Sequence, residues 1–266
     1  MARSSRFLEA IQRRMLVLDA GIGLRLILSK QIGENESSAR ANLELSEQVL
    51  ALHQADIEAG SDAILTNTFA TNRSSLVLEN RADDFLSNNT AAVALARQAA
   101  GPSRFVIGSI GPTLNPCAQN YRDQAVLLAE QGVDALILET HTIDAARVGL
   151  AAISRQVQIP IVVSLYLWPA NFEATARELI DLGVSALGAN CGKESADVFT
   201  IIERLAGRVS VPLIAKPSAG SWEGPEVFAE LAIKFRQLGV RLIGGCCGTT
   251  SAHIAAIRRA VDRVES

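Results

Sequence analysis

The sequence has little of several features, and each shortage excludes a class of protein. No apolar run approaches the ~18–20 residues that a membrane helix needs. Four cysteines in 266 residues are too few for a disulfide scaffold. Basic residues number 25 against 28 acidic ones, for a formal net charge of −3, so the excess of positive charge typical of nucleic-acid-binding proteins is missing. We therefore expect neither a membrane nor a nucleic acid as a partner.

The N-terminal segment also lacks the features of a secretory signal. Its apolar stretch, Met15 to Leu18, is shorter than the apolar region of about 7–15 residues that a signal peptide requires. Hydrophobic residues make up 48% of the chain, which rules out disorder. We expect a folded, cytoplasmic protein whose cysteines are reduced.

Four segments of the chain resemble one another, and each begins with a glycine. They are GSDAILT from Gly60, GVDALIL from Gly132, GVSALGA from Gly183 and GVRLIGG from Gly239. Each follows an amphipathic stretch, so the glycine stands where a helix ends in the left-handed conformation. Each then continues into a short apolar segment, typical of a strand buried on both faces. Each repeat is therefore predicted to join a helix to a buried strand.

Four more apolar segments, at 15–20, 104–109, 160–165 and 212–217, precede or separate these repeats. The total is eight strands, each followed by a helix candidate, at roughly the 25–35 residues that a βα unit takes. This alternation predicts a single (βα)8 TIM barrel of the α/β class, with residues 1–266 as one domain. An open doubly wound sheet is the alternative.

The catalytic groups of a TIM barrel lie at the C-terminal ends of its strands. Almost every predicted strand here ends in a polar or thiol-bearing residue: Asp19, Asn67, Ser109, Glu139, Ser164, Asn190, Cys191, Lys216, Cys246 and Cys247. Polar residues follow strands in any protein because the chain exits into solvent. Three cysteines at two strand ends are not explained in that way, since a free cysteine usually behaves as a small buried hydrophobe.

The three cysteines predict a metal site at the mouth of the barrel. Cys191 ends the sixth predicted strand, and Cys246 and Cys247 end the eighth. Neighbours in a regular strand point to opposite faces, so this pair can share a site only if the flanking glycines let the chain turn. Three thiolates with an open fourth position are typical of catalytic zinc. The alternatives are copper(I), a Cys246–Cys247 disulfide, three unrelated packed cysteines, and a structural zinc site that includes Cys117. Outside that last alternative, Cys117 is expected to be a packing residue.

The motifs at these strand ends resemble those of the homocysteine S-methyltransferase family. The resemblance rests on LDAGIG (18–23), GSDAILTNTF (60–69), GSIGP (108–112), GVDALILET (132–140), GANCG (188–192), KPSAG (216–220) and GGCCGTT (244–250). GGCCGTT together with an upstream NCG is its specific part. The resemblance covers nearly the whole chain.

The resemblance implies an enzyme that binds Zn²⁺ through Cys191, Cys246 and Cys247 and methylates the thiolate of homocysteine, or of a close thiol or selenol, to give methionine. Asp19 and Glu139 match the residues that hold the ammonium and carboxylate end of the amino acid. Asn67 and Asn190 are further candidates for substrate binding. The implied partners are a small thiol acceptor and a methyl donor, S-methylmethionine or S-adenosylmethionine.

Two other functions remain open from the sequence: an acceptor subunit that receives the methyl group from a corrinoid protein, and a non-catalytic zinc- or thiol-binding protein. His141 is a candidate acid or base, but transfer between a thiolate and a sulfonium needs no proton, which favours an ordinary polar loop residue. His53 and His253 fall in helix patterns and are expected to be peripheral.

The chain departs from the family pattern near the predicted donor path. Leu24 and Arg25 stand where Thr and Glu are common, Ser218 replaces the usual Asn, and the loop from Gly220 to Pro225 is shorter than usual. A positive charge on Arg25 beside the donor would disfavour a cationic donor. A solvated, outward-pointing Arg25 is the alternative.

Overall fold

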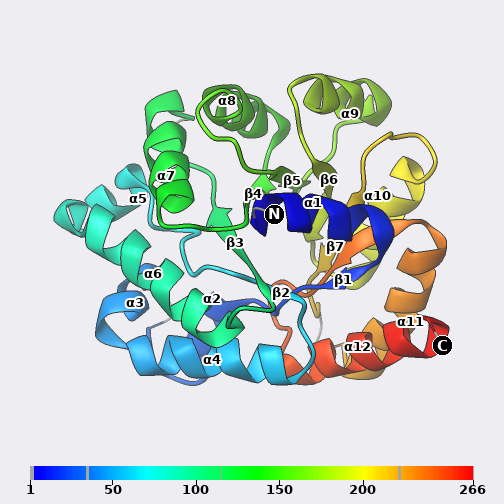
Figure 1. The fold of residues 1–266 in the computed structure, drawn as a ribbon, viewed down its shortest axis with the longest axis horizontal. Coiled ribbons are helices and arrows are strands. Elements are labelled where there is room, and N and C mark those ends of the chain that lie inside the picture. The colour runs from blue at the N-terminus through cyan, green and yellow to red at the C-terminus, as the bar shows by residue number, and fades with distance from the viewer. Residues whose placement is uncertain (1–2, 34–35, 115, 221–222, 266) are drawn as a thin grey trace.

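Eight parallel strands alternate with helices and form a nearly closed (βα)8 barrel, as predicted (Figure 1). The computed structural model describes residues 3–33, 36–114, 116–220 and 223–265. From β2 to β8 each strand pairs with the next one in sequence, and β1 pairs with β8 but not with β2. The strands are β1 Leu16–Val17, β2 Ala63–Leu65, β3 Phe105–Ile110, β4 Ala135–His141, β5 Ile161–Leu165, β6 Ala186–Cys191, β7 Leu213–Pro217 and β8 Val240–Ile243.

Helices form the outer layer around the strands. They are α1 Arg3–Arg13, α2 Ile22–Leu28, α3 Ala41–Glu44, α4 Ser46–Glu58, α5 Arg73–Leu78, α6 Phe85–Ala100, α7 Ala118–Glu130, α8 Ile143–Ile153, α9 Phe172–Asp181, α10 Ser195–Leu205, α11 Pro225–Gln237 and α12 Ser251–Glu265. No helix in the described part of the chain is long and apolar enough to cross a membrane.

The four repeat glycines end helices in the predicted conformation. Gly60, Gly132, Gly183 and Gly239 follow α4, α7, α9 and α11 with φ of 105°, 84°, 93° and 81°. A side chain at these positions would be strained because L-residues rarely adopt such angles. The glycine repeat therefore marks the boundary between a helix and the next strand.

Strands β1 and β2 do not pair with each other, so the barrel has a seam between them. At this seam the carboxylates of Asp62 and Asp19 accept hydrogen bonds from backbone N–H groups. The backbone N–H of Asp62 donates to the carbonyl oxygen of Val17 (2.7 Å), and the Val17 N–H donates to Asp62 Oδ2 (2.9 Å). Further along, the Leu65 N–H donates to Asp19 Oδ2 (2.8 Å). Strand β1 spans two residues, 16–17, and is shorter than the apolar segment 15–20 that predicted it.

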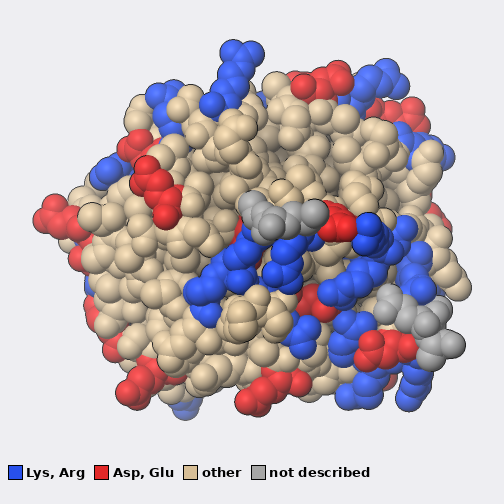
Figure 2. Space-filling model, in the orientation of Figure 1, with Lys and Arg blue, Asp and Glu red and all other residues tan. Residues whose placement is uncertain are grey.

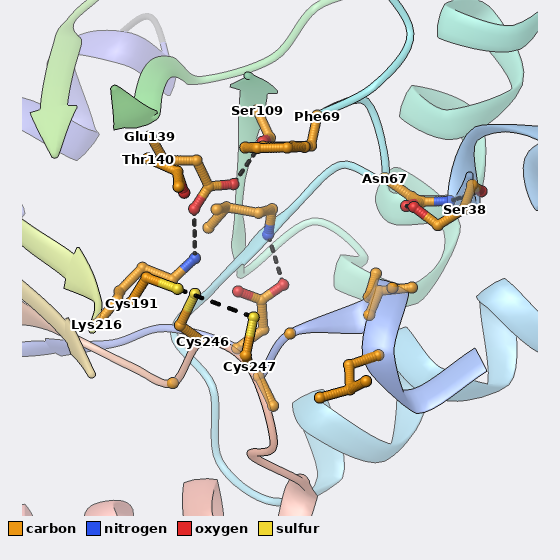
Figure 3. Close-up of a pocket in the computed structure, with 18 of the residues that line it drawn as sticks. Ser38, Asn67, Phe69, Ser109, Glu139, Thr140, Cys191, Lys216, Cys246 and Cys247 are labelled. Carbon is orange, nitrogen blue, oxygen red and sulfur yellow. Dashed lines mark hydrogen bonds and ion pairs between the residues drawn. The ribbon is translucent and has the colours of Figure 1, made fainter. Parts of the chain in front are cut away.

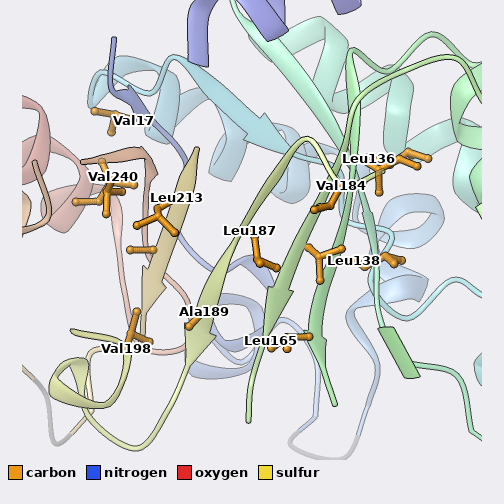
Figure 4. Packing of buried hydrophobic residues seen from close by; sticks show 14 of the residues in the cluster. Val17, Leu136, Leu138, Leu165, Val184, Leu187, Ala189, Val198, Leu213 and Val240 are labelled. Atoms are coloured by element: carbon orange, nitrogen blue, oxygen red, sulfur yellow. The ribbon is translucent and has the colours of Figure 1, made fainter. Parts of the chain in front are cut away.

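Two apolar layers hold the barrel together. Alternate strand residues fill the interior with Phe7 and Ile11 of α1, and Phe7 meets Phe105 edge-on at 5.4 Å between ring centroids. The intervening strand residues, among them Leu136, Leu187 and Leu213, pack outward against helix residues such as Val198 of α10 (Figure 4). Helix α1 therefore closes the N-terminal end of the barrel and leaves the opposite end open.

Arginine side chains gather around α1 on this closed face (Figure 2). Two buried aspartates neutralise part of this charge. Asp62 forms ion pairs with Arg14, Arg104 and Arg258, and Asp134 forms them with Arg3 and Arg97. These ion pairs tie α1 and α12 to strand starts, away from the mouth.

Candidate active site

Three thiols meet at the open end of the barrel (Figure 3). The Sγ atoms of Cys191, Cys246 and Cys247 lie within 4.8 Å of one another, and those of Cys191 and Cys247 are 4.0 Å apart. Strand β7 lies between the two segments that supply them. Cys191 pairs with Pro217, whose carbonyl oxygen accepts from the Cys246 N–H at 2.8 Å.

The adjacent cysteines share one site because the chain turns after β8. The strand ends at Ile243, and Gly248 has a φ of 78°. The Ala219 N–H donates to the carbonyl oxygen of Cys247 (2.9 Å), which fixes the turn to the end of β7. All four cysteines are free thiols.

Cys117 lies outside this group of thiols. It is exposed and precedes α7, where its backbone N–H donates to Thr113 Oγ1 (3.2 Å). The prediction that Cys117 is a packing residue is therefore wrong, because the β3–α7 loop carries its side chain to the surface.

Two residues at the site have backbone conformations that L-residues rarely adopt. Thr140 has a φ of 62° at a bulge in β4, and Cys191 has a φ of 69°. Asn190 holds Thr140 with two bonds: its Oδ1 accepts from the Thr140 N–H (2.9 Å), and its Nδ2 donates to Thr140 Oγ1 (2.7 Å). A strained backbone conformation persists only where contacts with the surrounding structure hold it in place, and it is typical of functional sites.

The three thiols fit a zinc ion. Tetrahedral zinc with Zn–S bonds of about 2.3 Å places its sulfurs about 3.8 Å apart, close to the separations seen here. Bonds from the two neighbouring thiols hold the pKa of Cys191 well below its ordinary value, whereas the same contacts and burial raise the pKa of Cys246. Ser218 Oγ, where the family usually has Asn, donates to Cys191 Sγ (3.5 Å).

A cavity of about 240 Å³ opens beside the thiols. Its wall includes the predicted residues Asp19, Asn67 and Glu139 and all three cysteines, together with Lys216. Asn190 is not in this wall: it lies behind it, holds Thr140 and directs Nδ2 toward Cys246 Sγ at 3.8 Å.

Asn67 lines the cavity, but both polar atoms of its side-chain amide are hydrogen-bonded to other residues of the protein. Its Nδ2 donates to the Ser38 carbonyl oxygen (2.7 Å) and to Asn42 Oδ1 (3.0 Å), and its Oδ1 accepts from Ser38 Oγ (2.9 Å). Asn67 therefore anchors the segment before α3 as one wall of the cavity.

Glu139 already has two partners inside the protein. Its Oε1 accepts from Ser109 Oγ (2.5 Å), and its Oε2 accepts from Lys216 Nζ (3.1 Å). Burial alone would lower the pKa of Lys216, but the charges of Glu139 and Asp19 outweigh burial and raise it. Lys216 and Ser109 were visible at strand ends, yet nothing in the sequence indicated that they contact Glu139.

Asp19 is buried, and only one of its oxygens is satisfied. Oδ2 accepts from the Leu65 N–H, whereas Oδ1 has no hydrogen-bond partner among the described residues. Burial raises its pKa to about 7, partly offset by the charge of Lys216. A buried acceptor without a partner beside an empty cavity is suited to a ligand's N–H donor.

Arg25 adopts neither predicted arrangement. Its guanidinium binds both carboxylate oxygens of Asp56 on α4 (3.0 and 2.6 Å), and its Nε donates to the Gly21 carbonyl oxygen (3.0 Å). Its side chain is only 9% exposed. Arg25 is therefore neither solvated nor a free charge on the donor path. Residues 221–222 of the short loop from Gly220 to Pro225 lie outside the described residues.

His141 is a buried strand residue, and the interpretation as a loop histidine is wrong. It ends β4, its Nδ1 lies 2.8 Å from the Glu139 carbonyl oxygen, and its ring contacts that of Tyr121 at 5.6 Å. Burial lowers its pKa to about 4, so it is neutral at physiological pH. His253 bonds to Thr250 and to the Glu223 carbonyl oxygen in the loop beside the mouth.

His53 lies on α4, outside the cavity wall, and its side chain is fully buried, which predicts a pH-dependent stability. Burial, with a smaller effect of Arg25, lowers its pKa from 6.5 to about 3. Neither ring nitrogen has a partner in the described part of the chain. The neutral ring therefore stabilises the fold fully above pH 6.5, and that contribution is lost as the pH falls.

Replacing His53 with Leu is expected to reduce this pH dependence. Between pH 7 and pH 5 the wild type should lose about 2 kcal/mol more free energy of unfolding than the variant, from roughly 1.4 kcal/mol per pH unit below 6.5. Urea unfolding at the two pH values measures the difference. Equal losses in both proteins would show that His53 is not held neutral.

Comparisons with known proteins place this site in context. A sequence profile described as homocysteine S-methyltransferase matches residues 16–261. The methionine synthase of Mycobacterium tuberculosis is 25% identical over 97% of this chain, and that of Mycobacterium leprae is 28% identical over 96%. The chain spans about a quarter of the length of these curated relatives, 25% in each case.

Solved structures share the fold. The metallated form of the homocysteine methyltransferase MmuM from Escherichia coli superposes with a TM-score of 0.82 at 20% identity, covering 97% of this chain and 99% of that one. A methyltransferase from Methanosarcina mazei superposes with a TM-score of 0.69 at 15% identity, covering 100% of both chains. At these identities the likeness establishes the barrel architecture.

Proposed function

Because the chain belongs to the homocysteine S-methyltransferase family, we propose that it is a zinc-dependent enzyme that methylates the thiol of homocysteine, or of a close thiol or selenol, to give methionine. The observation that carries the proposal is the group of three thiols within 4.8 Å of one another at the mouth of a 240 Å³ cavity. The MmuM structure that shares this fold carries a metal according to its description.

Cys191, Cys246 and Cys247 would hold the ion. A thiol of the acceptor coordinated to zinc there would have a lowered pKa and would be a thiolate at neutral pH. Three cysteinates already exceed the two charges of the ion, which leaves more electron density on the acceptor sulfur than histidine ligands would. Asn190 and Ser218 donate to two of these sulfurs and orient them.

The cavity wall positions the rest of the acceptor. Asp19 lines the cavity, and its buried Oδ1, which has no partner among the described residues, is the acceptor we assign to the ammonium of an amino-acid thiol. A charge-assisted bond of this kind is about twice as strong as a neutral one. Phe69 and Leu24 add apolar surface to the wall of the same cavity.

The reaction needs no general base in the transfer step. The acceptor sulfur forms a bond to the methyl carbon of a sulfonium donor as the donor's C–S bond breaks, and the electron pair of that bond returns to the donor sulfur. The products are methionine and a neutral thioether. The acceptor's thiol proton passes to solvent water before transfer, and the buried, neutral His141 takes no part.

The donor we propose is S-methylmethionine or S-adenosylmethionine. Arg25 does not oppose either cation, because Asp56 neutralises it. The second candidate function is that of an acceptor subunit that receives the methyl group from a corrinoid protein. This function is compatible with the similarity to methionine synthases, which are about four times the length of this chain. A non-catalytic thiol-binding protein is the third.

One experiment separates these functions. Zinc-loaded protein is incubated with L-homocysteine and a ¹³C-methyl donor, in turn S-methylmethionine, S-adenosylmethionine and methylcobalamin, and labelled methionine is measured by mass spectrometry. We expect label from a sulfonium donor, at a rate proportional to enzyme. Label from methylcobalamin alone would favour the corrinoid-dependent function, and no label from any donor would leave thiol binding without catalysis.

A further inference from the structure

Lys216 is a buried lysine in the wall of the substrate cavity. It lies on β7 with 4% of its surface exposed, and it lines the cavity together with Asp19, Glu139 and Cys246. Its ammonium points across the cavity to Glu139 (Figure 3). A lysine is almost never fully buried unless its charge is paired, and Lys216 is paired with Glu139 at 3.1 Å.

The hydrogen bonds of this ammonium are incomplete. A lysine carries three N–H donors, and among the described residues the one bond of Lys216 Nζ is that to Glu139 Oε2 at 3.1 Å. Glu139 has no oxygen left without a partner, since Oε1 accepts from Ser109. Two residues of the cavity wall therefore have unused hydrogen-bonding capacity: Lys216 has spare N–H donors, and Asp19 has one buried carboxylate oxygen, Oδ1, without a partner among the described residues.

This pair of groups is complementary to a zwitterion. We propose that Lys216 binds the carboxylate of the acceptor while Asp19 binds its ammonium. In this assignment, which rests on the proposed function, Glu139 is a positioning residue that aims Lys216 into the cavity. It replaces the expectation that Glu139 binds the amino acid directly.

The assignment defines the acceptor class. An acceptor must carry a carboxylate as well as a thiol, because a bare amine thiol would leave the donors of Lys216 unsatisfied at a buried site. Selectivity for the carboxylate arises from Lys216 on β7, and selectivity for the amine arises from Asp19 after β1. The two contributions are therefore separable by substitution.

The test measures thiol binding by isothermal titration calorimetry on zinc-loaded protein, without a methyl donor. Three ligands are compared: L-homocysteine, its decarboxylated analogue and its deamino analogue. The variant is Lys216→Met, and the matched control is Lys234→Met at an exposed position on α11. Lys216→Met should weaken L-homocysteine and the deamino analogue by about 10- to 100-fold, the effect of a lost hydrogen bond to a charged group. It should change the Kd of the decarboxylated analogue by less than about 3-fold, and Lys234→Met should leave the Kd of all three ligands unchanged.

The outcomes are distinguishable. An equal change for all three thiols, or no change for any, would overturn the assignment and leave Lys216 as an internal counter-ion of Glu139. If Lys216→Met alone does not fold because Glu139 is left unpaired, the double variant Lys216→Met/Glu139→Gln removes both charges and must show the same selective loss. A wild-type protein that binds none of the thiols would overturn the proposed function and this assignment together.

Discussion

Replacing Cys246 with Ala is expected to abolish zinc binding and methyl transfer while leaving the barrel folded. Substitutions that only touch the surroundings of a metal ligand cost about 10- to 100-fold in affinity or activity, so loss of a ligand should cost at least about 100-fold. The change removes one sulfur at the mouth and none of the apolar layers that hold the barrel. Metal analysis, activity and thermal unfolding measure the three quantities.

Cys117→Ala is the matched control for this substitution. Cys117 is an exposed free thiol outside the group of three, so its loss should leave one zinc per chain and full activity. A Cys246→Ala protein that kept its zinc would contradict the assignment of Cys246 as a ligand. Equal losses in both variants would point to general thiol damage rather than to the site.

Replacing Arg25 with Met is expected to destabilise the protein by about 3–5 kcal/mol, the usual cost of leaving one partner of a buried ion pair unpaired. The side chains of Arg25 and Asp56 are 9% and 0% exposed. Burial already raises the pKa of Asp56, and the charge of Arg25 is the main effect that offsets burial. Without Arg25 the carboxylate would have to be protonated or remain a buried, unpaired charge.

Chemical denaturation of two variants tests this expectation. In the double variant Arg25→Met/Asp56→Leu the unpaired charge is gone, so much of the lost stability should return. The control Arg13→Met breaks an exposed pair with Glu9 and should cost about 0–1 kcal/mol. A loss below about 1 kcal/mol for Arg25→Met would mean that this pair does not anchor the β1–α2 loop to α4.

The positions of the eight strands could be predicted because each is a short apolar run between helix and loop signals. The ends of four helices could be predicted from the glycines at 60, 132, 183 and 239, which all have a positive φ. The three thiols could also be placed together, because parallel strands of a barrel end at one mouth. These features depend on local sequence and on topology, which a single chain reveals.

The pairing of side chains across the site could not be predicted in this way. Lys216 and Glu139 are 77 residues apart, and Arg25 and Asp56 are 31 apart. Their contacts depend on strand register and on rotamers. Glu139 was assigned to the substrate because a carboxylate after an apolar strand needs a partner, and the partner proves to be a lysine of the chain itself. The burial of His53 could not be predicted because its helix has no clear polar face.

The most direct test of the central claim is X-ray absorption at the zinc edge, before and after addition of L-homocysteine. We expect three sulfur neighbours per zinc at about 2.3 Å, supplied by Cys191, Cys246 and Cys247, and four once homocysteine is bound. Zinc surrounded mainly by nitrogen and oxygen, or a sulfur count unchanged by saturating homocysteine, would contradict it.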